Sequence, residues 1–528
     1  MKKVLLCGLI LTRLLFSYTG EVEESIKTPG NSPTGLAYDG KNLWLADRGL
    51  NKIFCINTIT GKVIKEIPSP SYWPMGLAWD GKYLWNADWK TGKIYMIDTK
   101  SGIVKRAIDT PTPSPRGLAW DGKYLWLADN AEDKIIKISP SDGTTIVEFD
   151  APASDPRGLT YDGKYLWIAD RIQDEIYMMS PDNGEVLIVF DAPGPFARGL
   201  AFDGNSIWVA DYQNDYIYKL KIRDGIKFIR EDQRESIVTF THLIRNFGPG
   251  RILKAEVHIA LPKDRDNQEL VSENEYITEP KDFVTDQWGQ KTAYYLYTNI
   301  NPNEVVKSII KYHVKVYAVR YFIYPDEVGT LKDIPKEIKK KYTVDNDKYQ
   351  INHPVIKKAL NKAVGDEQNV YWIIRKIYRY VLDHMYYELS GGWNTAPTVL
   401  SRGNGSCSEY SFVFISLCRS AGVPARYVGS VVVRGDDASM DDVFHRWVEV
   451  YMPGYGWIPI DPSGGDKPSP REQALGFGYL QNRFLITTES GGNSTTLSWY
   501  YNSNEFIETE PNTHYEVETI AEWEPVFK

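Results

Sequence analysis

The stretch "GLAWDGKYLWLAD" at residues 117–129 recurs along the first 225 residues of the chain. Its other copies follow at intervals of 41 residues: "GLAYDGKNLWLAD" from 35, "GLAWDGKYLWNAD" from 76, "GLTYDGKYLWIAD" from 158 and "GLAFDGNSIWVAD" from 199. In each copy Asp-Gly stands between two apolar segments, where a hairpin turn with positive φ accepts glycine. Self-similarity at this period, with several short strands per unit, is typical of a β-propeller.

The fifth copy is incomplete. "YIYKLKIRDG" at 216–225 has no fourth strand after it, whereas "ESIKTPGNSP" at 24–33 reads as an unmatched fourth strand before the first copy. We therefore expect an all-β five-bladed propeller over 21–225, closed by its own N-terminus, which hides the sheet edges. The repeated tryptophans are expected to pack between blades, and the repeated aspartates to cap turns, although these could also ring a central ion. They are Trp44, Trp85, Trp126, Trp167 and Trp208, and Asp47, Asp88, Asp129, Asp170 and Asp211.

Beyond residue 225 the period is lost. "LKAEVHIALP" at 253–262 alternates apolar and polar residues, so 226–334 is predicted to form an antiparallel β-domain. "DEQNVYWIIRKIYRYVLDHM" at 366–385 places apolar residues on one helical face, and strands follow it. Helices followed by strands predict an α+β domain over 335–470, and 471–528 reads as a strand-rich C-terminal appendage.

The N-terminus, "MKKVLLCGLILTRLLFSYTG", has lysines ahead of an apolar stretch and small residues near its end. This pattern predicts a signal peptide at 1–20 and an exported protein, whether periplasmic, extracellular or on the cell surface. Arg13 interrupts the apolar run, so anchoring by an uncleaved N-terminus stays open. The net charge of −8 is spread along the chain, which argues against a nucleic-acid partner.

One cysteine has a setting that suits chemistry. In "NGSCSEYSF" at 404–412, Ser406 and Glu409 form the capping-box pattern S-x-x-E, which makes Cys407 the first residue of a helix. The unpaired amides and dipole at a helix start lower the pKa of a thiol and can hold an oxyanion. Cys418 falls within the apolar part of the same helix and is expected to be core.

A proton shuttle and its orienting acid follow in "FHRWVEVYMPGYGWIPIDPS" at 444–463. His445 opens a strand, a turn lies at 453–456, and Asp461 ends the returning strand. The two side chains can face the same side only if the turn has an odd length or the ribbon has a bulge. The rival base His384 ends a helix and has no visible acidic partner.

These motifs carry a family resemblance. Residues 395–465 resemble the core of the transglutaminase-like superfamily of papain-like thiol enzymes, through "GNGSCSEYS", "CRSAGVPARYV", "HRWVEVY" and "GWIPIDPS". The resemblance implies a triad of Cys407, His445 and Asp461 and acyl transfer from glutamine or peptide amides, with Trp393 as a candidate oxyanion residue. The chain shows neither the acidic loop of calcium-dependent members nor paired CxxC zinc cysteines, so no cofactor or metal is predicted. The repeated W-x-A-D resembles the NHL and lactonase-like propeller repeats.

The sequence thus predicts a multidomain, exported cysteine peptidase or amidase that acts on protein or peptide substrates, with cell-envelope material among the candidates. Hydrolysis of the acyl-enzyme is preferred, because transfer to lysine needs a site that excludes water and guides an amine. Two alternatives stay open: a protein-crosslinking transglutaminase with the same triad, and a propeller-based binding protein whose core is inactive. The pattern indicates no particular ligand for the propeller.

Overall fold

The computed structural model describes residues 17–223, 225–389, 392–435 and 438–527, so most of the predicted signal peptide lies outside the described residues. The chain forms two compact units. The first comprises Met1–Lys227 with Lys467–Leu475, and the second comprises Phe228–Asp466 with Gly476–Lys528.

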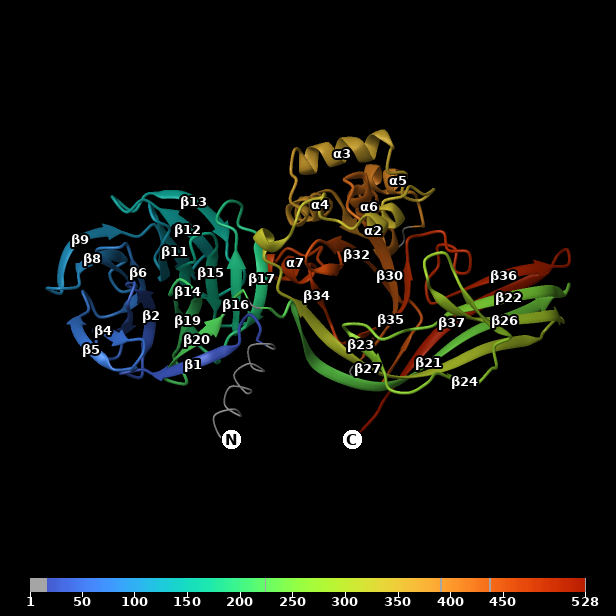
Figure 1. The fold of residues 1–528 in the computed structure, drawn as a ribbon, viewed down its shortest axis with the longest axis horizontal. Coiled ribbons are helices and arrows are strands. Elements are labelled where there is room, and N and C mark those ends of the chain that lie inside the picture. The colour runs from blue at the N-terminus through green and yellow to red at the C-terminus, as the bar shows by residue number, and fades with distance from the viewer. Residues whose placement is uncertain (1–16, 224, 390–391, 436–437, 528) are drawn as a thin grey trace. The chain divides into compact units, whose positions relative to one another are not determined.

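Each copy of the repeat folds into an antiparallel sheet (Figure 1, blue to green). Within the described residues the first unit contains five four-stranded sheets. They are β2 (Pro33–Tyr38), β3 (Asn42–Asp47), β4 (Lys52–Asn57) and β5 (Val63–Pro68); β6 (Pro74–Trp79), β7 (Leu84–Asp88), β8 (Lys93–Asp98) and β9 (Ile103–Asp109); β10 (Pro115–Trp120), β11 (Leu125–Asp129), β12 (Lys134–Ile138) and β13 (Thr145–Asp150); β14 (Pro156–Tyr161), β15 (Leu166–Asp170), β16 (Glu175–Met179) and β17 (Val186–Asp191); and β18 (Ala197–Phe202), β19 (Ser206–Asp211) and β20 (Tyr216–Lys221) with β1 (Val22–Lys27).

The N-terminal strand supplies the fourth strand of the last sheet. β1 pairs antiparallel with β20, with Ile26 opposite Ile217. This is the pairing that the incomplete fifth repeat predicts, although the strand begins at Val22 rather than at residue 24.

The Asp-Gly turns are built as the repeat predicts. The turn glycines, for example Gly40 and Gly204, have φ of +94° and +99°, where a side chain would be strained. The preceding aspartate accepts a hydrogen bond from the repeat's tryptophan, as in Trp167 Nε1 to Asp162 Oδ2 at 2.9 Å. The repeated W-x-A-D aspartates accept backbone N–H groups of turns, as Asp47 does from Leu50 at 2.8 Å.

The repeated tryptophans pack against the neighbouring repeat, as predicted. Trp44 lies in one apolar cluster with Leu77 of the second repeat, and Trp208 of the fifth lies with Leu36 of the first. The innermost strands approach closely at the repeat glycines. A Cβ at Gly199 would lie 2.9 Å from the backbone nitrogen of Leu36, so only glycine fits between these strands. This succession of sheets is that of a β-propeller.

A short segment from late in the sequence belongs to the first unit. Helix α7 (Pro470–Leu475) packs beside β17. Arg471 holds the buried Glu175 with two hydrogen bonds, from Nε at 2.6 Å and from Nη2 at 2.7 Å. Ala474 joins the apolar cluster that contains Trp126 and Leu159.

The second unit contains two antiparallel sheets that share a core. One has the order β23 (Gln268–Leu270), β27 (Val305–Tyr321), β21 (Phe228–Gly248), β37 (His514–Pro525) and β31 (Ser439–Asp441), with β24 (Glu275–Tyr276) and β34 (Tyr479–Leu480) also on β27. The other has the order β25 (Asp282–Thr285), β26 (Lys291–Ile300), β22 (Ile252–Ala260) and β36 (Ser503–Thr509). The C-terminal strands therefore pair with strands some 250 residues earlier in the chain.

The rest of the second unit is a sheet with helices. Its strand order is β33 (Gly456–Ile460), β32 (His445–Met452), β30 (Ala425–Val432) and β35 (Phe484–Ser490). The helical elements are η1 (Pro325–Glu327), α2 (Lys336–Tyr342), α3 (Pro354–Val364), α4 (Val370–His384), α5 (Ala396–Arg402) and α6 (Cys407–Ser420), and β28 (Tyr386–Tyr387) pairs in parallel with β29 (Asn404–Gly405). α6 packs against α3, α4, α5, β30 and β32, which buries its residues from Ser408 to Arg419.

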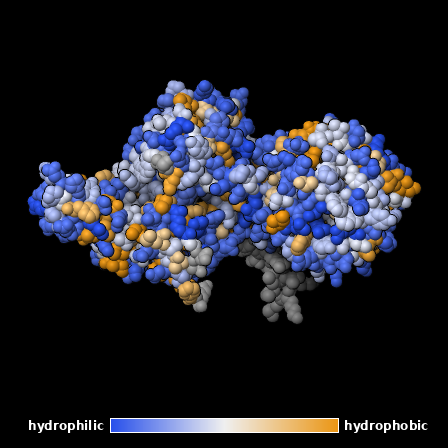
Figure 2. Space-filling model, turned by 180° about the vertical axis from the view of Figure 1, so that it is seen from behind, coloured by the Kyte–Doolittle hydropathy of each residue, from blue (hydrophilic) through white to orange (hydrophobic). Residues whose placement is uncertain are grey.

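Hydrophilic residues predominate on the face shown in Figure 2, and the hydrophobic ones form small separate groups. No helix in the described part of the chain is both long and apolar enough to cross a membrane.

Candidate active site

Cys407 stands at the start of the most buried helix of the second unit. Ser406 is the N-cap of α6, and Ser406 and Glu409 form the predicted capping box. Because the cap fixes where the helix begins, it places the thiol beside the first, unpaired N–H groups of α6. All three cysteines in the described residues are free, and Cys418 is fully buried in the helix interior.

Glu409 ties helix α6 to the segment of chain that precedes it. Its buried carboxylate accepts from Arg402 Nη2 at 2.7 Å, from the backbone nitrogen of Asn394 at 3.1 Å, and from the backbone nitrogen of Ser406 at 3.3 Å. A carboxylate buried with several donors holds all of them in place, because leaving any unpaired is costly. The position of Cys407 is thus set by more than the helix alone.

His445 and Asp461 meet across the β32–β33 hairpin. His445 Nε2 and Asp461 Oδ2 are 2.7 Å apart. Met452 pairs with Gly456, so the turn has three residues, the odd length that brings the two side chains to one face. Asp461 Oδ1 also accepts from Ser463 Oγ and from the Gly464 nitrogen, both at 2.8 Å, which fixes the carboxylate.

The chain enters β32 through a constrained residue. Phe444, directly before His445, has φ of +60°, a conformation that non-glycine residues rarely adopt. Buried Asp441 accepts a hydrogen bond from the Phe444 nitrogen at 3.1 Å, and Arg434 Nη2 donates to the carbonyl oxygen of Phe444 at 3.0 Å. Strain held in this way is typical of functional sites. The imidazole of His445 stacks on Phe484, with ring centroids 5.6 Å apart.

The ionisation of the three groups is coupled. Burial raises the pKa of Cys407, but its hydrogen bond with His445, the positive charge of His445, and the backbone N–H and charge of Arg446 together hold that pKa below its ordinary value. Burial lowers the pKa of His445, yet the charge and hydrogen bond of Asp461, with Cys407, raise it to about 10. Burial raises the pKa of Asp461, and His445 more than offsets this and lowers it. The arrangement therefore favours a thiolate beside an imidazolium.

The same contacts decide which ring nitrogen of His445 faces Asp461 and which faces Cys407. Since Nε2 of His445 faces Asp461, Nδ1 is the ring nitrogen left for the sulfur of Cys407. Asp461 thus fixes the orientation of the ring that is hydrogen-bonded to the thiol, the geometry that an orienting acid has in nucleophilic catalysis.

Arg446 is a site residue that the sequence reasoning did not identify. Its side chain is fully buried, and its guanidinium carbon lies 4.3 Å from the ring centroid of Tyr427 and 5.0 Å from that of Trp393. Nη2 donates to the carbonyl oxygen of Trp499 at 2.5 Å. A cation held among aromatic rings gains cation–π attraction when it is desolvated. No spacing in the sequence signals these contacts, because the rings come from distant segments.

Trp393, the candidate oxyanion residue, is one of the aromatic residues that surround the guanidinium group of Arg446. Its ring lies 4.6 Å from that of Tyr500 and over Arg446, and Lys348 Nζ donates to its carbonyl oxygen. Tyr387 is also near the thiol: burial raises its pKa, as do the charges of Cys407 and Asp461.

Three other histidines have structural contacts away from the thiol. His384 Nδ1 pairs with the carbonyl oxygen of Tyr380 at 2.8 Å, and its Nε2 is 3.1 Å from Lys362 Nζ. His313 Nε2 pairs with Glu235 at 3.0 Å, and His258 stacks on Tyr294.

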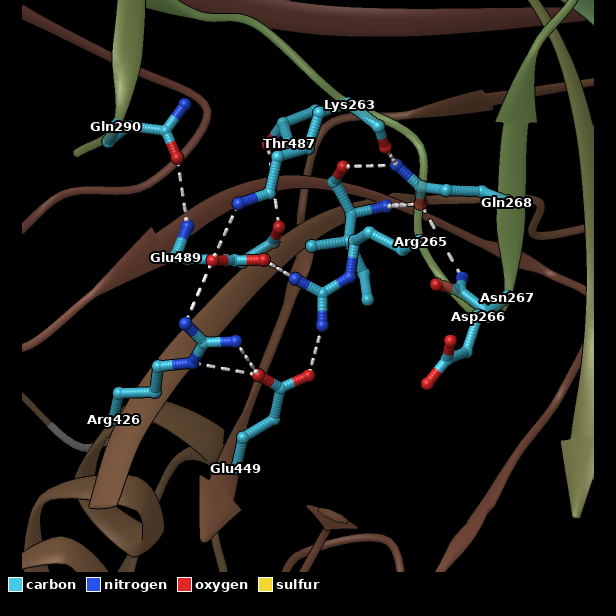
Figure 3. Close-up of polar contacts among 12 residues, drawn as sticks. Lys263, Arg265, Asp266, Asn267, Gln268, Gln290, Arg426, Glu449, Thr487 and Glu489 are labelled. Carbon is cyan, nitrogen blue, oxygen red and sulfur yellow. Dashed lines mark hydrogen bonds and ion pairs between the residues drawn. The ribbon is translucent and has the colours of Figure 1, made fainter. Parts of the chain in front are cut away.

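A charged cluster lines a separate cavity of about 340 Å³ in the second unit (Figure 3). Arg265 and Arg426 both aim their guanidinium groups at Glu449 and Glu489; Arg426 lies 2.7 Å from Glu449 and 2.9 Å from Glu489. These buried charges neutralise one another, so the cluster is explained by the fold.

Comparison with known proteins assigns a family to the segment that carries the thiol. Residues 357–462 match the model of the Transglutaminase-like superfamily. An uncharacterized protein of Haemophilus influenzae is 27% identical over an alignment of 157 residues, and the match covers 24% of this chain and 42% of that protein.

Two solved structures are also similar. A Cytophaga hutchinsonii protein provisionally described as a cysteine protease is 14% identical, with a TM-score of 0.38, over 55% of this chain and 92% of its own. Virginiamycin B lyase from Staphylococcus aureus is 26% identical, with a TM-score of 0.26, over 37% of this chain and 68% of its own.

Proposed function

Because residues 357–462 form a transglutaminase-like domain, we propose that this protein is an exported thiol enzyme that attacks peptide or glutamine amides through Cys407, His445 and Asp461. The observation that carries the proposal is the 2.7 Å pair of His445 and Asp461 beside a thiol whose pKa is lowered at the start of α6. Protein or peptide substrates, cell-envelope material among them, fit this chemistry.

In the first step the thiolate of Cys407 attacks the amide carbonyl carbon. A C–S bond forms, and the carbonyl electrons move to oxygen, where the free N–H groups at the start of α6 can stabilise the oxyanion. His445, protonated at the outset, gives a proton to the leaving nitrogen. The C–N bond breaks, and amine or ammonia leaves a thioester on Cys407.

In the second step water resolves the thioester. His445, now neutral, takes a proton from the water as its oxygen attacks the acyl carbon. The C–S bond breaks, the carboxylic acid leaves, and the thiolate–imidazolium pair returns. An amine that took the place of water would give a crosslink instead.

We also propose that the first unit is a closed five-bladed propeller that supports the enzyme or recruits its substrate. The pairing of β1 with β20 and the packing of Trp208 on Leu36 support closure. Release of the chain without residues 1–20 would support export.

The decisive experiment uses a synthetic glutamine-containing peptide incubated with the full chain, with and without excess ethylamine, and analysed by mass spectrometry. Cleaved or deamidated peptide that disappears with Cys407→Ala supports hydrolysis. Ethylamine incorporation as the dominant product would assign the chain as a transferase. An unchanged peptide, together with no selective alkylation of Cys407, would favour a binding protein with an inactive core.

A further inference from the structure

Three arginines occupy the same position in successive repeats of the first unit. Arg116, Arg157 and Arg198 directly precede the glycine that opens the repeat motif, in β10, β14 and β18. Thr34 and Met75 hold this position in the first two repeats, and these five side chains line one cavity. It offers about 10 Å³ to the centre of a water-sized group, which is room for a single oxygen-sized group among the arginines.

The positive charge at this cavity is only partly balanced. Asp155 pairs with Arg157, at 2.7 Å from Nε, and also with Arg171 at 2.5 Å, so one buried carboxylate serves two guanidinium groups. Arg116 Nε donates at 2.8 Å to the neutral amide oxygen of Asn130. Arg198 Nε is buried and has no hydrogen-bond partner in the described part of the chain.

The arginines also repel one another. Burial and the positive charge of Arg157 together lower the pKa of Arg116 to about 10. Burial and the charges of Arg157 and Arg48 likewise lower the pKa of Arg198 to about 10. An anion among them would relieve both the repulsion and the unmet hydrogen bonding.

Aromatic rings flank the arginines. Arg198 lies 4.0 Å from the ring centroid of Tyr212, and Arg116 lies 5.2 Å from that of Trp89. Trp89 in turn stacks on Trp73, with centroids 4.4 Å apart. Such rings offer flat apolar surface beside the cationic groups.

The repeats differ from one another near this cavity. The framework residues, Asp-Gly and the W-x-A-D motif, recur in all five copies. The positions around the cavity do not: the residue after W-x-A-D is Arg48, Trp89, Asn130, Arg171 and Tyr212 in turn, and the residue three before the motif glycine is Ser32, Trp73, Ser114, Asp155 and Phe196. If these positions only had to pack against the neighbouring repeat, similar residues would be expected in every repeat. Their variation therefore fits a ligand that is itself asymmetric.

We propose that Arg116, Arg157 and Arg198, with Trp89 and Tyr212, form an oxyanion-binding site in the first unit. Its ligand carries a carboxylate or phosphate group next to a flat apolar group. The guanidinium groups hold the oxyanion through charge-assisted hydrogen bonds, and the rings contact the apolar part. This site does not depend on the thiol chemistry of the second unit.

The test measures the binding of benzoate and of phenyl phosphate to the full chain, by calorimetry and by the shift in melting temperature. Benzamide, which has the same ring as benzoate but no charge, is the control ligand. The site is supported if either anion binds saturably and if Arg198→Gln weakens that binding at least about tenfold. The anion that binds more tightly shows whether the site prefers a carboxylate or a phosphate. The control Arg106→Gln changes an exposed arginine of β9 and should bind like the unchanged chain. Cys407→Ala should also bind normally, so loss of enzyme activity and loss of this site are distinguishable.

A second readout compares the melting temperature of the protein without and with the anion. Since Arg198 is partly unpaired and repelled, Arg198→Met should leave the melting temperature of the free protein equal or higher, and should abolish the rise caused by the anion. A marked fall in melting temperature with Arg198→Met would show that the arginine serves the fold, and would overturn the proposal. So would the absence of saturable binding of both anions, or equal affinity of the Arg198→Gln variant.

Discussion

The guanidinium carbon of Arg446, the residue that follows His445 in β32, lies 4.3 Å from the ring centroid of Tyr501. Burial raises the pKa of Tyr501, and the charge of Cys407 raises it further, so this ring lies close to the thiolate. Arg446 is therefore a fixed cation, held by aromatic rings, beside the group that has to stay ionised.

We expect Arg446→Met to raise the pKa of the Cys407 thiol, because a positive charge that favours the thiolate is lost. A rise of one pKa unit would lower the thiolate fraction about tenfold at a pH well below the original pKa. The measurement is the rate of iodoacetamide alkylation of Cys407 against pH. Arg446→Lys keeps the charge and should retain more of the rate; equal pH profiles for the Met variant and the unchanged chain would remove Arg446 from this role.

Alkylation at neutral pH should be selective for Cys407. Burial raises the pKa of Cys55 to about 11 and raises that of Cys418 as well, whereas the pKa of Cys407 is lowered. Peptide mapping after brief treatment with iodoacetamide should find Cys407 labelled first. His445→Gln removes the largest stabiliser of the thiolate, so its labelling should fall at pH 7 and recover only as the pH approaches that of an ordinary thiol, about 8.5. Equal labelling of the three cysteines would contradict the lowered pKa.

Asp461→Asn should destabilise the fold in a pH-dependent way. The raised pKa of His445 contributes stability that is fully present below about 6.5 and is lost as the pH rises through about 10. The lowered pKa of Asp461 contributes stability that is present above about 3.9 and is lost as the pH falls below it. The cost of the variant should thus be largest near pH 6, at about 2 kcal/mol, and should shrink toward both limits. Urea unfolding at several pH values measures it, and a cost independent of pH would refute the ion pair.

Ile26→Asp should weaken the first unit. Ile26 is buried in β1 among Leu36, Leu43 and Ile217, so a carboxylate there would lose apolar contacts and lie unpaired, at a cost of about 3 kcal/mol. Lys27→Asp, at the exposed neighbouring position, is the control and should change little. A chain that begins at Gly35 should show the larger effect of losing β1. If that chain melts and stays soluble like the unchanged protein, β1 does not close the propeller.

Asp162→Ala should destabilise the fourth repeat. The Asp162 carboxylate accepts from Trp167 Nε1 at 2.9 Å and from the Tyr165 nitrogen at 2.7 Å. Leaving a buried indole N–H without its acceptor should cost about 2 kcal/mol of unfolding free energy. Asp182→Ala, at an exposed turn position, should be close to neutral in the same thermal melt, and equal effects of the two variants would argue against the Trp167 contact.

Local patterns in the sequence predicted much of the fold. The period of 41 residues predicted the repeated sheets, because the same short strands and turns recur. The S-x-x-E pattern placed the start of α6, and the stripe Val370, Ile374, Ile377 and Val381 is the buried face of α4. These features depend on residues close together in the chain.

Contacts between distant segments could not be predicted in the same way. The cage of Arg446 uses rings from residues 393, 412, 427 and 501. The pairing of β37 with β21 joins strands about 280 residues apart, and either could have paired with another edge. The sequence alone does not distinguish the three-residue turn that aligns His445 and Asp461 from a bulge, since either would bring the two side chains to one face.

The attachment of Arg471 to Glu175 decides how this protein can be divided. The chain crosses between the two units three times, at 227–228, 466–467 and 475–476, so neither unit is a continuous stretch. A fragment of residues 1–227 expressed alone would lack α7 and leave the Glu175 carboxylate buried without its cation, a defect of about 3–5 kcal/mol. A full chain nicked after residue 227 would instead keep α7 in its place, so the two pieces should travel together until denatured.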